Sequence, residues 1–264
     1  MNHLSNNYSS PDHGIEAQRS VFERNFGRDP GDFAFNDTKN LVVRYLRDRR
    51  LNKVMERLQH YLGQDLSQVS ALCVCGGVGG EATYLRNAGI GEVTNTDFSE
   101  NALGVCRARD PRLKTRLLNA ETMDLENESF DVVLVQDGLH HLPRPVLGFN
   151  EMLRVARKAV IVLEPQSGWS GRILGREWEE HEGIFNYVFR WNADLLKSAT
   201  RSQLLKRDLA FEVIRLWDHS GFVHRAVHPL GNGKLSLLAA KSIYAALTPL
   251  NFLGNQFIGM VFKS

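Results

Sequence analysis

A run of glycines between two apolar segments constrains the fold of this chain more than any other feature. The apolar residues 71–75 (ALCVC) are followed at once by the glycine-rich turn GGVGG over 76–80. This pattern is typical of a buried parallel strand that enters a tight turn. Helix-favouring residues follow over 81–87, a second strand is predicted over 92–96, and Asp97 stands at the carboxyl end of that strand.

This succession of strand, turn, helix, strand and acid predicts a nucleoside-binding unit. Glycines let the backbone come close to a ligand, and the first turn of the following helix offers unpaired N–H groups. An acid after the second strand can accept hydrogen bonds from ribose hydroxyls. Dinucleotide-binding dehydrogenases share these elements, so the unit alone does not identify the cofactor.

Composition places the chain among globular proteins of a reducing compartment. At 264 residues and 43% hydrophobic content, one domain with a sizeable core is expected. The net charge of +2 gives no general attraction to nucleic acid or to an anionic membrane. Cys73, Cys75 and Cys106 are too few for a disulfide scaffold and lack further ligands at zinc spacing, so we expect buried thiols and no metal site. The first residues carry no signal or anchor pattern, and we expect a cytoplasmic protein.

Helices and strands alternate along most of the chain. After the glycine unit and a preceding helix over 40–62, the pattern predicts a helix over 99–109, strands over 114–118 and 130–136, a helix over 145–155 and a strand over 159–163. It then predicts a helix over 202–219, a strand over 222–228, a helix over 235–247 and a last strand over 257–262. Lys241, Pro249 and Asn251 interrupt the apolar window 235–254, which therefore predicts a core helix and no membrane span.

Two additions accompany the domain predicted over 39–264. Residues 1–38 are rich in Asn, Ser, Asp and Gly and predict a partly flexible arm, in which Val21, Phe22 and Phe26 are the candidates for ordering. The alternation breaks over 166–203, where an aromatic and charged passage predicts an inserted cap. Its aromatic side chains would either wall an apolar acceptor pocket or cover the edge of the sheet.

Five motifs follow one another over about residues 65–165: CGGVGG, VTNTDFS, NAET, SFDVVLVQDGLHHL and IVLEP. In this order and spacing they resemble the class I S-adenosylmethionine-dependent methyltransferases, and among these the small-molecule, type 11-like members. The turn fits G-x-G-x-G better than the G-x-G-x-x-G of a dehydrogenase. The resemblance implies an α/β fold with a doubly wound, seven-stranded, mostly parallel sheet whose last strand is antiparallel. It also implies S-adenosylmethionine as the cofactor.

The resemblance further implies which residues hold the first part of the cofactor. The turn residues Gly76, Gly77 and Gly79 would approach its methionine portion. Asp97 would hold the ribose hydroxyls, and Phe98 would lie against the adenine.

The third and fourth strands complete the implied site. Asn119, followed by Ala120, takes the place where the family commonly has an acid that binds the adenine amino group, and its amide oxygen also accepts hydrogen bonds. Gln136 and Asp137 end the fourth strand beneath the cofactor.

The first strand departs from the family pattern. Cys73 and Cys75 stand where the family usually has an acid inside the strand and a glycine opening the turn. The cofactor's methionine ammonium thus lacks its expected partner. Either Asp137 or Glu164 compensates, or cofactor binding is weakened or lost.

Two histidines are candidates for removing a proton from the methyl acceptor. His141 follows the fourth strand and would reach the mouth of the cleft, where a neutral imidazole can take a proton near pH 7. His181 lies in the predicted cap between Glu180 and Glu182. The alternatives are that His140 and His141 only shape the turn by hydrogen bonding to the backbone, and that His181 is an exposed residue of a charged helix.

The sequence thus predicts transfer of a methyl group to an oxygen, less readily a nitrogen or carbon, of a small organic molecule. Besides that small-molecule acceptor, a homo-oligomer is possible, and no nucleic-acid partner is expected. The alternatives are an RNA or protein methyltransferase and a methyltransferase fold kept as a non-catalytic binding module. Gln136-Asp137-Gly138-Leu139 differs from the [DNS]-P-P-[YFW] sequence typical of adenine-amino methyltransferases, which disfavours the nucleic-acid alternative.

Overall fold

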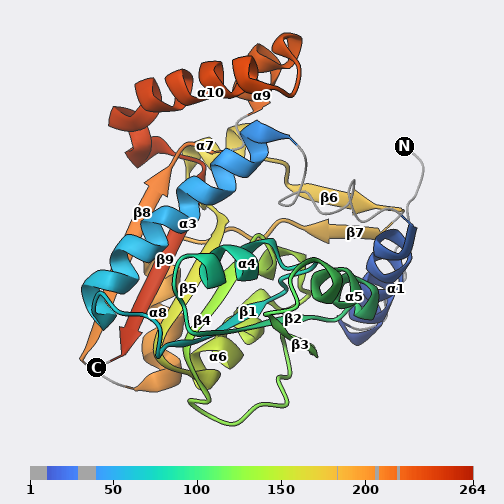
Figure 1. The fold of residues 1–264 in the computed structure, drawn as a ribbon, viewed down its shortest axis with the longest axis vertical. Helices are drawn as coiled ribbons and strands as arrows, with labels where there is room; N and C mark the ends of the chain where they lie inside the picture. Colours follow the sequence, from blue (N-terminus) through green and yellow to red (C-terminus); the bar gives the residue numbers. More distant parts are fainter. Residues whose placement is uncertain (1–10, 29–39, 183, 206–207, 219–220, 264) are drawn as a thin grey trace.

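A seven-stranded sheet forms the centre of the molecule (Figure 1). The computed structural model describes residues 11–28, 40–182, 184–205, 208–218 and 221–263. The strand order is β3-β2-β1-β4-β5-β9-β8, with β9 antiparallel to both neighbours and the remaining pairs parallel. This confirms the predicted fold class. The strands are β1 (Ser70–Val74), β2 (Glu92–Asp97), β3 (Lys114–Leu117), β4 (Phe130–Gln136), β5 (Ala156–Pro165), β8 (Leu209–Leu216) and β9 (Gln256–Lys263).

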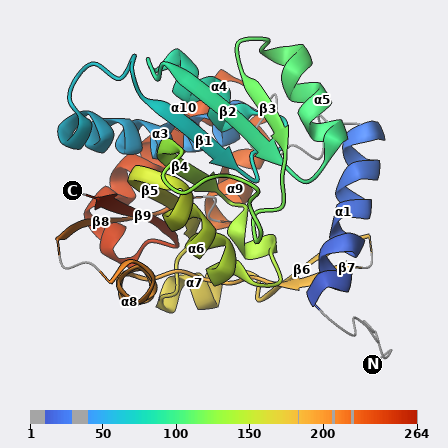
Figure 2. The same cartoon turned by 90° about the horizontal axis from the view of Figure 1, so that it is seen from below.

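Helices cover both faces of the sheet because successive side chains of a buried strand point to opposite faces. Along β1, Cys73 packs in the same core cluster as Leu58 and Leu85, whereas its neighbour Leu72 packs in the cluster that contains Phe149 and Leu196. The first cluster lies under α3 and α4, and the second lies under α6 and α8 (Figure 2). The bounds are α3 (Leu41–Leu62), α4 (Gly80–Asn87), α5 (Glu100–Arg109), α6 (Pro145–Val155) and α8 (Ala193–Leu204).

The long helix α3 follows from its cap and its apolar stripe. The side chain of Asn40 accepts hydrogen bonds from the backbone N–H groups of Val42 and Val43, which have no partner inside the helix. Leu51 and Leu58 recur on one face and are fully buried against the sheet. The predicted helix over 40–62 is therefore present with the expected bounds.

The predictions for 202–219 and 222–228 are wrong. Asn192 caps α8 by accepting a hydrogen bond from the N–H of Leu195 at 2.8 Å, and Leu205 ends the helix with a left-handed φ of 51°. Residues Leu209–Leu216 (LAFEVIRL) then form the edge strand β8, because their aromatic and β-branched side chains suit a half-buried strand paired with β9. The segment predicted as a strand over 222–228 is instead the short helix α9 (Gly221–Val227).

The C-terminal helices pack on the beginning of α3. Tyr244 of α10 (Lys234–Leu247) and Val223 of α9 share a core cluster with Leu46. In the part of the chain that the structure describes, the 3₁₀ turns are η2 (Leu139–His141), η3 (His228–Leu230) and η4 (Thr248–Leu253). Within the described ranges, none of the helices combines the length and the apolar character needed to cross a membrane.

Two segments outside the alternating core lie next to each other beside the sheet (Figures 1 and 2). One is α1 (Pro11–Arg28), in the part of the chain predicted as an arm. The other follows α7 (Trp169–Leu174) and is the hairpin of β6 (Trp178–His181) and β7 (Ile184–Tyr187), in the part predicted as a cap. Residues 1–10 and 29–38 of the predicted arm, and the side chain of Phe26, lie outside the described residues.

A buried arginine ties α3 to the ends of two strands. Arg50 is fully buried, with Nη1 lying 2.8 Å from Asp137 Oδ2 after β4 and Nε lying 3.4 Å from Asp218 Oδ2 after β8. Burial alone would lower the pKa of Arg50, but the two carboxylates outweigh it and raise the pKa above its usual range. The guanidinium therefore remains charged and balances two acids in the interior.

Replacing Arg50 by Ala should destabilise the protein strongly, because it leaves Asp137 and Asp218 without their shared cation. Removal of one partner of a buried ion pair costs about 3–5 kcal/mol. Arg57→Ala on the same helix is the matched control, since Arg57 is exposed and its Nε lies 3.5 Å from Glu212 Oε2; its loss should cost less than about 1 kcal/mol. Urea unfolding of both variants measures the difference, and equal losses would contradict the role given to Arg50.

Candidate functional site

The carboxyl ends of the parallel strands border one large cavity, which we call the central pocket. In the strand order, β2 lies on one side of β1 and β4 on the other, so the chain continues from β1 toward one end of the sheet and from β4 toward the other end. Open α/β sheets bind ligands beside the carboxyl ends of two such strands. The cavity has a volume of about 830 Å³. Of the residues that the sequence predicted for the cofactor, its lining includes Gly76, Gly77, Asp97, Phe98, Asn119, Ala120, Gln136 and Asp137, but not Gly79.

The glycine turn is held by the neighbouring strand β2. The N–H of Gly76 donates to Thr96 O at 2.8 Å, and the side-chain amide of Asn95 donates to Gly77 O at 2.9 Å. A Cβ atom at Gly76 would lie 2.0 Å from Asn95 Oδ1, so any larger residue would displace the Asn95 side chain that holds the turn. Gly79 precedes α4 with a φ of 84°, a left-handed conformation that favours glycine. Gly79 thus shapes the turn without bordering the cavity.

Asp97 links the turn to the next helix and still faces the central pocket. Its Oδ2 accepts the N–H of Gly77 at 2.9 Å, and its Oδ1 accepts the N–H of Ser99 at 3.0 Å. A carboxylate has about four lone-pair positions, so acceptor capacity remains for a ligand. Burial raises the pKa of Asp97 to about 6, although these backbone hydrogen bonds oppose the shift. The group is therefore ionised at neutral pH and loses its charge in mild acid.

Aromatic and amide groups line the pocket beyond Asp97. The ring of Phe98 lies 5.5 Å from the ring of Phe22 on α1, measured between centroids. The Oδ1 of Asn119 accepts the N–H of Glu121 at 2.9 Å, which fixes the side-chain amide at the pocket wall. A flat ring and an oriented amide are suitable contacts for a planar heterocycle.

Glu81 is a pocket residue that the sequence analysis did not select. It lies in the first turn of α4, only 6% exposed, and its Oε1 has no hydrogen-bond partner among the described residues. Burial raises the pKa of its carboxyl. The signal in the sequence was an acid directly after the glycine run, at the helix N-terminus, where the backbone dipoles favour negative charge. Gln136 is similarly buried, and both polar atoms of its side chain lack such a partner within the described part of the chain.

The loop after β4 is organised by Glu164, which is fully buried at the end of β5. Its Oε1 accepts the N–H groups of Gly138 at 2.9 Å and Leu139 at 2.7 Å, and its Oε2 lies 2.6 Å from His140 Nδ1. Burial alone would lower the pKa of His140, but Glu164, Glu179 and Asp137 outweigh it and raise the pKa to about 9. The ring is therefore fixed in place and poorly suited to accept a proton at pH 7.

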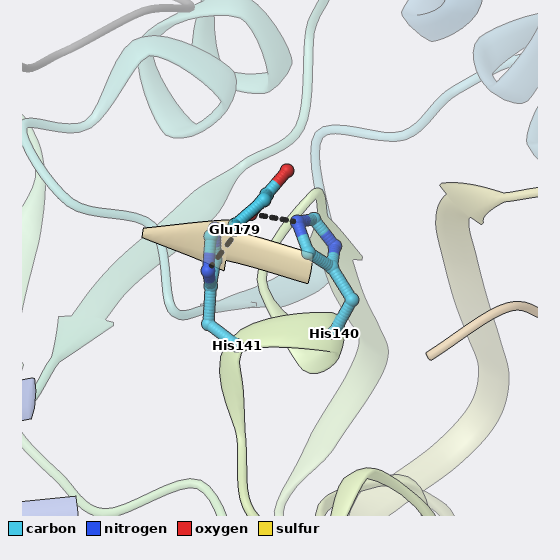
Figure 3. Close-up of side chains that lie close together, drawn as sticks. All are labelled: His140, His141 and Glu179. Atoms are coloured by element: carbon cyan, nitrogen blue, oxygen red, sulfur yellow. Dashed lines mark ion pairs between the residues drawn. The ribbon is translucent and has the colours of Figure 1, made fainter. Parts of the chain in front are cut away.

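His141 points toward the hairpin across the mouth of the pocket. Its Nδ1 lies 3.6 Å from Glu179 Oε2, and the same carboxylate oxygen lies 3.7 Å from His140 Nε2 (Figure 3). The ring of His141 also contacts Phe22 edge-on, with 5.8 Å between centroids. The structure thus places His141, but not Gly79, at the cavity. His181 belongs to β6, and its side chain lies outside the described residues.

The acids that were expected to compensate for the altered first strand are already engaged. Glu164 holds the loop after β4, and Asp137 pairs with Arg50. Burial raises the pKa of both Cys73 and Cys75 well above the usual thiol range, so neither carries charge near neutral pH. The carboxylate best placed to meet a cation in this wall of the pocket is therefore that of Glu81.

The predicted cap contributes polar and small residues to the central pocket, including Glu179 and Arg190. Of the predicted cap aromatics, Trp191 is buried in the core under α6, while Trp178 and Tyr187 pack edge-on against each other and are mainly exposed. An aromatic wall made by this segment does not line the cavity in the described residues. The phenylalanines that line the cavity are Phe98 after β2 and Phe22 of α1.

The residues present fit the cofactor that the resemblance implies. Asp97 offers acceptors for ribose hydroxyls, Glu81 offers a buried anion for an ammonium group, and Gln136 offers an amide that otherwise has no partner in the described structure. Gly76 leaves no room for a side chain and lets the backbone approach a ligand. A nucleoside that carries ribose hydroxyls and an ammonium group matches these residues.

Comparison with known proteins agrees with this chemistry. Residues 72–163 match the family model described as a methyltransferase domain. The demethylmenaquinone methyltransferase of Staphylococcus aureus (strain MRSA252) is 35% identical over 100 residues, which cover 36% of this chain and 42% of that relative. The alignment thus spans less than half of the relative's length.

Solved structures share the fold over a longer part of the chain. The magnesium protoporphyrin IX methyltransferase of Synechocystis PCC 6803, solved with bound S-adenosylmethionine, superposes with a TM-score of 0.54 and 12% identity over 93% of this chain and 97% of that one. An S-adenosylmethionine-dependent methyltransferase of Mesorhizobium loti superposes with a TM-score of 0.52 and 11% identity over 75% and 93%. At these identities the likeness shows a common fold.

Gly79→Ala should destabilise the turn through two separable effects. The φ of 84° costs any L-residue about 1–2 kcal/mol, and the new Cβ would lie 2.4 Å from Cys106 Sγ, an overpacking that costs about 1–3 kcal/mol more. Gly89→Ala is the control for the first effect, because its φ is 102° and a Cβ there meets no atom within 4 Å.

The second effect should be relieved by removing the thiol. In a double-mutant cycle measured by urea unfolding, Cys106→Ala should cost less stability in the Gly79→Ala background than in the wild-type protein, with a coupling of about 1 kcal/mol or more. Additive losses would show that the turn does not pack on Cys106 as described.

Proposed function

We propose that this chain, whose residues 72–163 belong to the methyltransferase-domain family, binds S-adenosylmethionine in the central pocket and methylates an oxygen of a small organic molecule. The observation that carries the proposal is that two acids, Asp97 and Glu81, border the same cavity. Asp97 faces the glycine turn with acceptor capacity to spare, and Glu81 is a buried carboxylate whose Oε1 has no hydrogen-bond partner among the described residues. Ribose hydroxyls and a methionine ammonium satisfy both.

The chain's own residues would bind and orient the cofactor. Gly76 and Gly77 let the backbone approach its methionine portion, and Gly79 sets the direction of α4. Glu81 accepts the ammonium group, in place of the strand acid that is absent at Cys73. Binding therefore remains possible although the first strand departs from the family pattern.

The remaining wall residues would recognise the nucleoside. Phe98 contacts the adenine face, while Asn119 and Ala120 border its edge. Gln136 supplies its otherwise unpartnered amide, and Asp137 contributes backbone groups at the end of β4. These assignments give each predicted residue at the cavity one role.

The acceptor would enter between α1 and the hairpin. When bound, the cofactor supplies a methyl group that its sulfonium charge already activates, so the chain must mainly align the acceptor and take up its proton. His141 and Glu179 stand at this side of the pocket and are proposed to receive that proton. His181 is proposed as a second candidate from the hairpin. His140 is less suitable because its pKa of about 9 keeps it protonated near pH 7.

A small acceptor agrees with the size and charge of the site. A cavity of about 830 Å³ lies within the usual range of small-molecule sites, about 300–1,000 Å³. An oxygen acceptor is favoured because His141 and Glu179 at the mouth suit the removal of a hydroxyl proton. The net charge of +2 provides no general attraction for RNA.

Calorimetry with S-adenosylhomocysteine tests the cofactor assignment, and its pH dependence tests Asp97. Because Asp97 has a pKa of about 6, it is charged at pH 8 and mostly protonated at pH 5, where the ligand's affinity should be about tenfold weaker. Asp97→Asn should bind more weakly at pH 8 and show little change between the two pH values. An absence of binding at millimolar concentration would favour a non-catalytic module, and binding that is independent of pH would remove the role of Asp97.

Glu81→Gln should weaken S-adenosylhomocysteine binding by removing a charge-assisted contact with the ammonium group. Hydrogen bonds to charged groups contribute about 1.5–3 kcal/mol, or roughly a 10- to 100-fold change in the dissociation constant. Adenosine, which lacks the amino acid portion, is the matched control ligand and should bind wild type and variant alike. An equal loss for both ligands would show that Glu81 supports the fold of the pocket instead of contacting the ammonium.

A further inference from the structure

Three potential metal ligands converge at the mouth of the central pocket. They are His140 Nε2, His141 Nδ1 and a carboxylate oxygen of Glu179, and the three atoms lie within 4.8 Å of one another. The carboxylate is 3.7 Å from the first nitrogen and 3.6 Å from the second. Ligand atoms about 2.1 Å from a shared ion lie roughly 3–4 Å apart, so the separations approach those of a bound state. Figure 3 shows Glu179 reaching toward both rings.

A buried carboxylate orients one of the two rings as a ligand. Glu164 Oε2 lies 2.6 Å from His140 Nδ1, so the ring donates its Nδ1–H to Glu164 and turns Nε2 toward Glu179. A bound ion would take the place of the proton that Nε2 carries in the metal-free protein. Histidines that bind metals almost always donate their other ring N–H to a carboxylate, carbonyl or water. Glu164 is itself fixed by two backbone N–H groups. The orientation of His140 by Glu164 therefore points to a cation independently of the spacing of the three ligand atoms.

The ligands come from two segments that are locked together. His140 and His141 belong to η2, directly after β4, and Glu179 belongs to β6. The side-chain amide of Asn186 on β7 donates to His140 O at 3.2 Å and ties the hairpin to η2. All three ligand residues border the central pocket, so open coordination positions would face its interior.

We propose that His140, His141 and Glu179 bind a divalent first-row transition-metal ion, which holds the hydroxyl oxygen of the methyl acceptor. Two imidazoles and one carboxylate suit zinc, iron or cobalt better than magnesium, and three protein ligands leave positions for water or substrate. The role given to the ion rests on the proposed function, whereas the binding of the ion does not.

The ion would change how the acceptor loses its proton. A hydroxyl bound to a divalent ion is more acidic, so its O–H bond breaks near neutral pH, the proton leaves to water, and the electron pair stays on the oxygen. His141 then acts as a ligand and not as the direct base. The acceptor class is accordingly a small molecule with an ionisable hydroxyl.

Titration of the untagged, chelator-treated full chain with Co²⁺ tests the site without any need for turnover. We expect one Co²⁺ per chain, visible as d–d absorption of a site with nitrogen and oxygen ligands, and binding at least tenfold tighter than that of Mg²⁺ in competition. Glu179→Gln and His141→Ala should each weaken Co²⁺ binding about 10- to 100-fold or more, as ligand and supporting-residue losses do elsewhere. Glu177→Gln, which removes a charge just before β6 outside the pocket lining, should leave binding unchanged.

Parallel calorimetry with S-adenosylhomocysteine separates the two proposals. The metal-free protein and the Glu179→Gln variant should still bind this ligand, which also shows that they are folded. Stoichiometric ligand binding without Co²⁺ binding at millimolar concentration would overturn the metal site and leave His141 as the direct base. Co²⁺ binding that Glu179→Gln does not weaken would also overturn it. Co²⁺ binding without ligand binding would overturn the proposed cofactor and leave the metal site standing.

Discussion

The loop that closes the central pocket depends on one buried carboxylate. Glu164 ends β5 with no exposed surface, and it accepts two backbone N–H groups of the loop after β4 while pairing with His140. A buried carboxylate is costly unless such partners satisfy it, so the loop and the acid stabilise each other. Since both strands are central, the position of His140 is set by the sheet. Through Asn186 and Glu179, the same loop also positions the hairpin.

Charge balance explains how this end of the sheet tolerates several acids. Arg50 neutralises Asp137 and Asp218, whereas Asp97 is held by backbone N–H groups. Glu81 lies near the charges of Arg47 and Arg50, and its Oε1 has no hydrogen-bond partner among the described residues. Burial raises the pKa of both Asp97 and Glu81, which means that their charged forms are destabilised in the free protein. A ligand that brings a positive charge and hydroxyl donors relieves that destabilisation, so binding and stability are coupled.

The sequence was sufficient for the parts of the fold that depend on strong local patterns. The sheet over β1 to β5 and the N-cap of α3 at Asn40 follow from apolar runs, glycines and capping residues. The segment over 209–216 was mispredicted because its apolar residues also fit a helix, and the pairing with β9 that decides for a strand is a long-range contact. Glu81 was overlooked although it follows the glycines directly, and the approach of Glu179 to His141 could not be seen because it depends on how the hairpin docks.

The two sides of the central pocket come from different parts of the chain. The match to the family model covers the proposed cofactor side, and it leaves out α1 and the hairpin on the other side. Asp97 and the glycine turn lie inside the matched segment 72–163, together with the rest of the proposed cofactor wall. Phe22 of α1 and Glu179 of β6 lie outside that segment, yet both contact His141, which stands at its acceptor side. Changes in the hairpin can therefore alter the proposed acceptor side without contacting the cofactor wall, whereas α1 touches both, because Phe22 also packs on Phe98. If the proposed function holds, the matched segment holds the cofactor, and α1 and the hairpin are the parts of the chain placed to contact the acceptor.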